Sequence, residues 1–151
     1  MIKSLKRFIT DIPWIIKHFF QRGKRGWADC DTFSMDNYLI SVILPMLKHL
    51  KKNMPGYPGT FKSPEEWDIV MDSMIIGFEA GERILDDDYM DTIQPGWYKD
   101  PPKDCSIAEI FESCRIEPES WEKYKEITEK DEELFHSGMD LFNKYFFGLW
   151  N

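Results

Sequence analysis

The sequence contains few of the residues that mark redox chemistry, metal binding or membrane insertion. Its 151 residues include three cysteines and three histidines. The three cysteines are an odd and sparse set and no two of them form a C-x-x-C pair, so a reducing compartment is favoured. The glycine-rich motifs G-x-S-x-G, G-x-G-x-x-G and the P-loop are missing. No apolar run approaches the roughly 20 residues of a membrane span, so no spanning helix is expected.

Charge is abundant but unevenly distributed. The net charge is −8, yet residues 1–30 (the basic head) carry +5 and residues 61–151 (the acidic body) carry −14. At this length a chain can bury about 68–70% of its unfolded surface, which is enough for a core without metal or disulfides. We therefore expect a single domain over residues 1–151. Its charge separation indicates either two surfaces for different partners, or charge pairing within or between subunits.

Apolar residues recur at helical spacing in several segments, and no segment alternates as a strand would. Residues 34–50 carry one such stripe. Ser63, Pro64 and Glu66 form a capping box ahead of a second helix that should end near residue 86. Shorter helices are expected over residues 12–20, ended by Gly23, and from Ser106 to near Cys114.

The C-terminal segment from about residue 118 has two readings. Its middle, Glu126 to Glu133, is almost entirely charged, so one helix of about 30 residues would have a solvent-exposed middle and two apolar ends. The alternative is a break near Ser137-Gly138. The fold class is then all-α, an irregular bundle of four to five helices with one long loop at about 86–105. A shared core is predicted from Tyr38, Leu39, Val42, Ile43, Met46, Trp67, Val70, Met71, Met74, Phe78, Leu141, Phe142 and Tyr145.

Three residue sets are candidates for catalysis or metal binding. Glu79, Glu82 and Asp86 have the helical spacing of the Mg²⁺ carboxylates in all-α nucleotide pyrophosphohydrolases. That family needs a second acidic set, and the best available, Glu65-Glu66 with Asp68, is already explained by helix capping. Glu133-x-x-His136 has the spacing of di-iron bundles, which need a second copy. Cys30 stands between two aspartates that should raise its pKa and suppress the thiolate. We therefore expect no catalytic residue, no metal and no cofactor.

The basic head interleaves cations with aromatic rings. Lys17, Arg22, Lys24 and Arg25 alternate with Trp14, Phe19, Phe20 and Trp27. Such a mixture suits a phosphate-bearing ligand or nucleic acid. It also suits a peripheral membrane helix, with rings on one side and lysines on the other. The third reading packs the aromatics into the core and leaves the charges solvated.

Several segments carry a resemblance to other proteins. They are residues 25–36 (RGWADCDTFSMD), Gly56-Tyr57-Pro58-Gly59, residues 64–68 (PEEWD), and the ending Phe142-x-x-Tyr145-Phe146-x-x-Leu149-Trp150. This pattern resembles small bacteriophage-encoded proteins of unassigned activity. The resemblance implies an accessory protein that binds a host component in the host cell cytoplasm, including inhibitors of antiviral defence. It implies no catalytic residues.

The functional hypothesis is thus a non-enzymatic phage accessory protein that binds a host protein or a protein–nucleic acid complex. Occlusion, acidic mimicry of nucleic acid and sequestration of a nucleotide are the mechanisms considered, and a homodimer is an open alternative. The competing hypothesis is the pyrophosphohydrolase. Two glycines should keep Arg22–Gly26 out of a helix and on an exposed loop. The predicted binding residues are Arg22, Lys24, Arg25, Trp27, Asp29 and Asp31, covered by Trp97, Tyr98 and Lys99.

Overall fold

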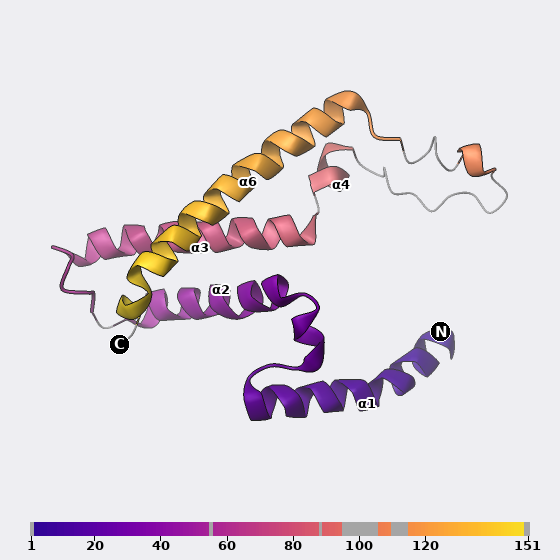
Figure 1. Ribbon diagram of the computed structural model, residues 1–151, viewed down its shortest axis with the longest axis horizontal. Coiled ribbons are helices and arrows are strands. Elements are labelled where there is room, and N and C mark those ends of the chain that lie inside the picture. Colours follow the sequence, from indigo (N-terminus) through magenta and orange to yellow (C-terminus); the bar gives the residue numbers. More distant parts are fainter. Residues whose placement is uncertain (1, 55, 88, 95–105, 110–114, 150–151) are drawn as a thin grey trace. The chain divides into compact units, whose positions relative to one another are not determined.

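The computed structural model describes residues 2–54, 56–87, 89–94, 106–109 and 115–149, with side chains of the first helix from Ile12 onward. Every regular element in these ranges is a helix (Figure 1): α1 (Ile2–Arg25), η1 (Asp29–Thr32), α2 (Met35–Asn53), α3 (Pro64–Asp86), α4 (Tyr89–Ile93), α6 (Pro118–Tyr145) and η2 (Phe146–Gly148). The all-α prediction is confirmed. The chain divides into two compact units, residues 1–39 and 40–151, which are described separately.

The N-terminal unit (residues 1–39) is built on α1, which is longer than predicted. Gly23 lies inside the helix, and a Cβ atom added there would meet nothing within 4 Å. The helix ends at Arg25. The next residue, Gly26, has a φ of +82°, which favours glycine, and its amide donates to the Arg22 carbonyl at 2.9 Å. The expectation that Arg22–Arg25 form an exposed loop is therefore wrong, because a single glycine costs a helix only about 1 kcal/mol.

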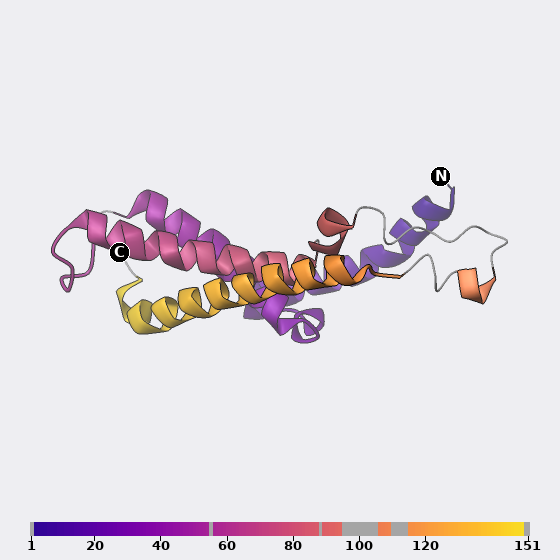
Figure 2. The ribbon, with the colours of Figure 1, turned by 90° about the horizontal axis from the view of Figure 1, so that it is seen from above.

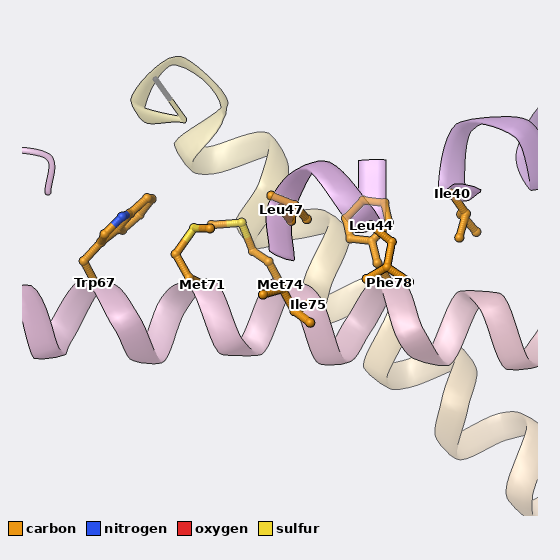
Figure 3. Close-up of a cluster of buried hydrophobic side chains, with 8 residues drawn as sticks. All are labelled: Ile40, Leu44, Leu47, Trp67, Met71, Met74, Ile75 and Phe78. Carbon is orange, nitrogen blue, oxygen red and sulfur yellow. The ribbon is translucent and has the colours of Figure 1, made fainter. Parts of the chain in front are cut away.

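The second unit (residues 40–151) holds the hydrophobic core. From α3 come Trp67, Met71, Met74, Ile75 and Phe78, and from α2 come Ile40, Leu44 and Leu47 (Figure 3). Side chains of α6 pack against this cluster, among them Phe135, Leu141, Phe142 and Tyr145. Figures 1 and 2 both show that α6 lies next to α3 and crosses it at an angle. The predicted contributions of α3 and α6 to one shared core are confirmed.

The buried face of α2 differs from the predicted one. Leu39, Val42 and Met46 are exposed, whereas Leu44 and Leu47 are almost completely buried. This helix has apolar residues on two faces, so their spacing alone does not decide which face turns inward. Packing against α3 selects the face of Leu44, and the other apolar stripe remains at the surface.

Glycines set the crossing of α3 and α6. A Cβ atom added to Gly77 would lie 2.6 Å from the Gly138 Cα, and one added to Gly138 would lie 2.7 Å from the Gly77 Cα. Backbones this close leave no space for a side chain. Since α6 is continuous from Pro118 to Tyr145, the alternative of a break at Ser137-Gly138 is wrong. Gly138 is a packing position.

The capping predictions agree with the structure. Ser63 accepts from the Glu66 amide at 3.4 Å, and α3 ends at residue 86, as expected. The Ser106 amide donates to the Glu109 carboxylate at 2.7 Å at the start of residues 107–109, which are helical. The remainder of that predicted helix, residues 110–114, lies outside the described residues.

The first part of the predicted loop at 86–105 differs from the prediction, and its residues 95–105 lie outside the described residues. Its first part contains α4, in which Tyr89 and Met90 are buried. Burial of these two large side chains within their own unit stabilises this short helix. The acidic residues Asp86, Asp87 and Asp88 just before it did not indicate a helix. In the described part of the chain, no helix has the length and apolarity needed to cross a membrane.

Candidate functional site

The segment after α1 folds back onto the helix through Asp31. The Arg22 guanidinium donates from Nε to Asp31 Oδ2 at 3.0 Å, and its Nη2 pairs with Oδ1. The Ala28 amide donates to the same carboxylate at 2.7 Å. Asp31 is 8% exposed, and the Arg22 hydrogen bonds lower its carboxyl pKa to about 2. A nearly buried carboxylate with this partner stays ionised.

Asp29 gathers three side chains of α1. Gln21 donates to Asp29 Oδ2 at 2.7 Å, and Lys17 Nζ lies 3.2 Å from the same oxygen. Arg25 pairs with Oδ1. Hydrogen bonds from Gln21, then Arg25 and Lys17, hold the Asp29 pKa well below its ordinary value. We call the contacts of Asp29 and Asp31 with α1 the α1–η1 network.

Aromatic and thiol groups complete this network. The Arg25 guanidinium carbon lies 3.7 Å from the centroid of the Trp27 ring, and Tyr38 donates to the Gly26 carbonyl. The Cys30 Sγ lies 3.4 Å from His18 Nδ1. Burial, followed by the hydrogen bond to Asp31, raises the Cys30 pKa. The expected suppression of the thiolate is confirmed in direction, with burial as its larger cause.

One side of α1 makes the network and the other side is apolar and exposed. At about 100° per residue, Lys17, His18, Gln21, Arg22 and Arg25 all point toward η1. The opposite arc, about 140° wide, carries large apolar side chains. Their exposed fractions are 37% for Ile12, 56% for Ile15, 50% for Ile16, 72% for Phe19 and 69% for Phe20.

The structure brings five of the predicted binding residues together. Arg22, Arg25, Trp27, Asp29 and Asp31 contact one another directly or through α1, and the exposed Lys24 lies on the last turn of that helix. The charges of Arg22 and Arg25 are engaged in holding the local fold. The other predicted residues, Trp97, Tyr98 and Lys99, lie outside the described residues.

The second unit contains a polar cluster that the sequence did not indicate. Arg83 donates to Asp131 at 2.8 and 2.7 Å, and the Tyr89 hydroxyl donates to Asp131 Oδ2 at 2.5 Å. The Arg83 hydrogen bonds lower the Asp131 pKa, and burial raises that of Tyr89. Asp131 lies in the stretch that was expected to be solvated. A lone aspartate in a charged run gives no local signal of burial.

The second unit also has an apolar groove between α2 and the end of α6. It encloses about 680 Å³ and is lined by residues that include Ile43, Met46, Leu50, Phe142, Phe146 and Leu149. Most of its wall is aliphatic or aromatic, and His49 and Asn53 supply its polar atoms. Such a wall offers burial to an apolar group and few contacts to a charged one.

The candidate metal carboxylates are used differently in the structure. Glu79 pairs with Lys48 at 2.7 Å, and Glu133 and His136 are exposed on α6. Across the residues the structure describes, no group of three or more His, Cys, Asp or Glu side chains is placed to hold a metal ion. Neither the Glu79, Glu82, Asp86 set nor the E-x-x-H pair forms a site in that part of the chain.

The chain was compared with protein-family models, with curated proteins and with solved structures, and none of them matches.

Proposed function

We propose that this protein is a non-enzymatic binding protein that attaches to a host component through α1. The observation that carries the proposal is the apolar arc of α1. Five large apolar side chains from Ile12 to Phe20 are exposed there, on the side of the helix opposite the α1–η1 network. Contiguous apolar surface of this kind is typical of interaction sites. The phage origin, the host cytoplasm as its location and a role as an accessory protein or defence inhibitor are parts of this proposal, supported by the sequence resemblance.

The α1–η1 network supports binding in a second way. It fixes the last turns of α1 with ion pairs from Arg22 and Arg25, so this part of the helix is ordered before a partner arrives. A preformed surface loses less conformational entropy on binding than a flexible one. Occlusion of a host protein or complex requires only such a surface, whereas nucleotide sequestration would need an enclosed polar pocket.

The test compares variants of the full chain expressed in the host. Ile16→Ser with Phe19→Ser removes the centre of the apolar arc, and Phe147→Ser removes an equally large side chain that is 89% exposed in η2. We expect the α1 double variant to lose the co-purifying host component, because its apolar contact is removed. The Phe147 variant should retain it. If both variants retain the component equally, the proposed function is wrong.

A further inference from the structure

The face of α1 that is free of the α1–η1 network has a definite chemistry. It is made of isoleucine and phenylalanine, and basic residues flank it. On the helical wheel, Phe20 borders Lys17 and Lys24 on one edge, and Ile15 borders Arg22 on the other. As sequence positions, Leu5, Phe8 and Ile9 continue the same three- and four-residue spacing along α1. A long helix with bulky apolar residues on one side and cations at both edges is typical of helices that lie in a membrane interface.

Charge distinguishes the occupants that this face could take. Residues 1–39 carry +3, whereas residues 40–151 carry −11. A second copy paired through the same face would bring Lys24 of two helices close together, and like charges repel. Lys17 and Arg22 at the edges of the face are paired with Asp29 and Asp31. An anionic lipid surface supplies the charge opposite to that of Lys24 at the edge of the face. Its acyl chains also offer burial to each apolar side chain.

The composition of the face also separates lipid from nucleic acid. Bases stack on aromatic rings, but Ile12, Ile15 and Ile16 offer no ring for stacking. The guanidinium groups that would contact phosphates on the other side of α1 are already paired, Arg22 with Asp31 and Arg25 with Asp29. Acyl chains accept isoleucine and phenylalanine equally well.

We infer that α1 is an interfacial helix that lies in the plane of an anionic membrane. The apolar side chains of the arc, Ile12, Ile15, Ile16, Phe19 and Phe20, enter the acyl region, and Lys17 and Lys24 remain among the headgroups. Long lysine side chains can keep their ammonium groups in water while their stems cover apolar surface. This inference rests on the proposed function and names the host component as the lipid surface.

The experiment is sedimentation of the full chain with vesicles of phosphatidylcholine alone, or with about one quarter phosphatidylglycerol. We expect sedimentation with the anionic vesicles, and much less with the neutral ones. Raising the salt from about 0.05 M to about 0.5 M should weaken it, because the Debye length falls severalfold. Absence of binding to both vesicles, or equal binding to both, would overturn the inference.

Two pairs of variants assign the binding to α1. Ile16→Ser with Phe19→Ser should lower vesicle affinity by about tenfold or more, because each large apolar side chain contributes that much when buried. Phe147→Ser should leave it unchanged. Lys24→Glu should weaken binding to anionic vesicles more than Lys52→Glu, which changes the same charge on the exposed surface of α2. Equal effects within either pair would contradict the assignment.

The two proposals fail differently in this experiment. If no vesicle binds but a host protein is retained through Ile16 and Phe19, the membrane inference is wrong and the proposed function holds. An α1-dependent dimer in sedimentation equilibrium would identify a second copy as the occupant and would also overturn the inference. If the α1 double variant changes neither vesicle binding nor retention of the host component, both proposals fail. Circular dichroism checks that each variant remains helical.

Discussion

Arg22 is the main group that lowers the pKa of Asp31 at the end of α1. Removing its guanidinium in Arg22→Gln should return the Asp31 pKa from about 2 toward 3.8, because Arg22 is the principal group that lowers it. Carboxyl chemical shifts followed by NMR against pH measure this change. Arg25→Gln is the matched control, since Arg25 pairs with Asp29. An unchanged Asp31 titration in Arg22→Gln would contradict the assigned pairing.

The same pairing makes the α1–η1 network dependent on pH. The folded pKa of Asp31 is depressed, so its contribution to stability is fully present above the unfolded value of 3.8 and is lost as the pH falls through about 2. The pKa of Asp29 is also lowered by its partners on α1. The contacts between η1 and α1 should therefore loosen in acid and be complete at neutral pH.

Asp131 is the second residue on which a local structure depends. Asp131→Asn leaves Arg83 with a weaker acceptor and changes the partner of the buried Tyr89 hydroxyl. We expect a loss of about 1–3 kcal/mol in the free energy of unfolding. The Arg83 side chain is 49% exposed, so water can compensate part of the lost pairing. Denaturant unfolding measures the loss, and Glu132→Gln, on the exposed neighbour, should cost much less.

At the scale of elements, the α3–α6 crossing depends on Gly77 and Gly138. Gly138→Ala would place a methyl group 2.7 Å from the Gly77 Cα, so the two helices must separate. Overpacking of this kind costs about 1–3 kcal/mol. Thermal or denaturant unfolding of the variant should show that loss.

Gly23→Ala is the control for Gly138→Ala, because it makes the same change inside another helix. Its added methyl group meets nothing within 4 Å, so it should stabilise α1 by about 0.5–1 kcal/mol through lower backbone entropy in the unfolded chain. A destabilised Gly23→Ala protein would mean that α1 does not continue through this position. Equal effects of the two substitutions would contradict the close crossing of α3 and α6.

At the scale of the whole molecule, the two units differ both in net charge and in where their apolar side chains lie. The acidic unit contains the hydrophobic core, and the basic unit exposes its apolar residues along α1. The proposed binding function predicts no turnover of nucleotides. Incubation with nucleoside triphosphates and Mg²⁺ or Mn²⁺ should give no product, and Glu82→Gln should behave as the wild type. Hydrolysis that disappears in Glu82→Gln would favour the pyrophosphohydrolase hypothesis.

The sequence by itself determined the features that depend on neighbouring residues. The all-α class and the limits of α3 follow from periodicity and from the Ser63 cap, because hydrogen bonds within one helix are local. The raised pKa of Cys30 was also predicted, although Asp31 contributes less to it than burial. The cations and aspartates that form the α1–η1 network were identified as a group, but their mutual pairing was not foreseen.

Tertiary structure decided which residues are buried and which side chains meet across long sequence separations. The sequence offers two apolar faces on α2, and only contact with α3 selects Leu44 over Met46. Gly138 is a residue type that often ends a helix, but here it lies inside α6 at the point where α6 comes closest to Gly77. Asp131 is buried because Arg83, 48 residues earlier in the chain, reaches it. Each of these outcomes depends on packing between distant segments, which local propensity and periodicity do not encode.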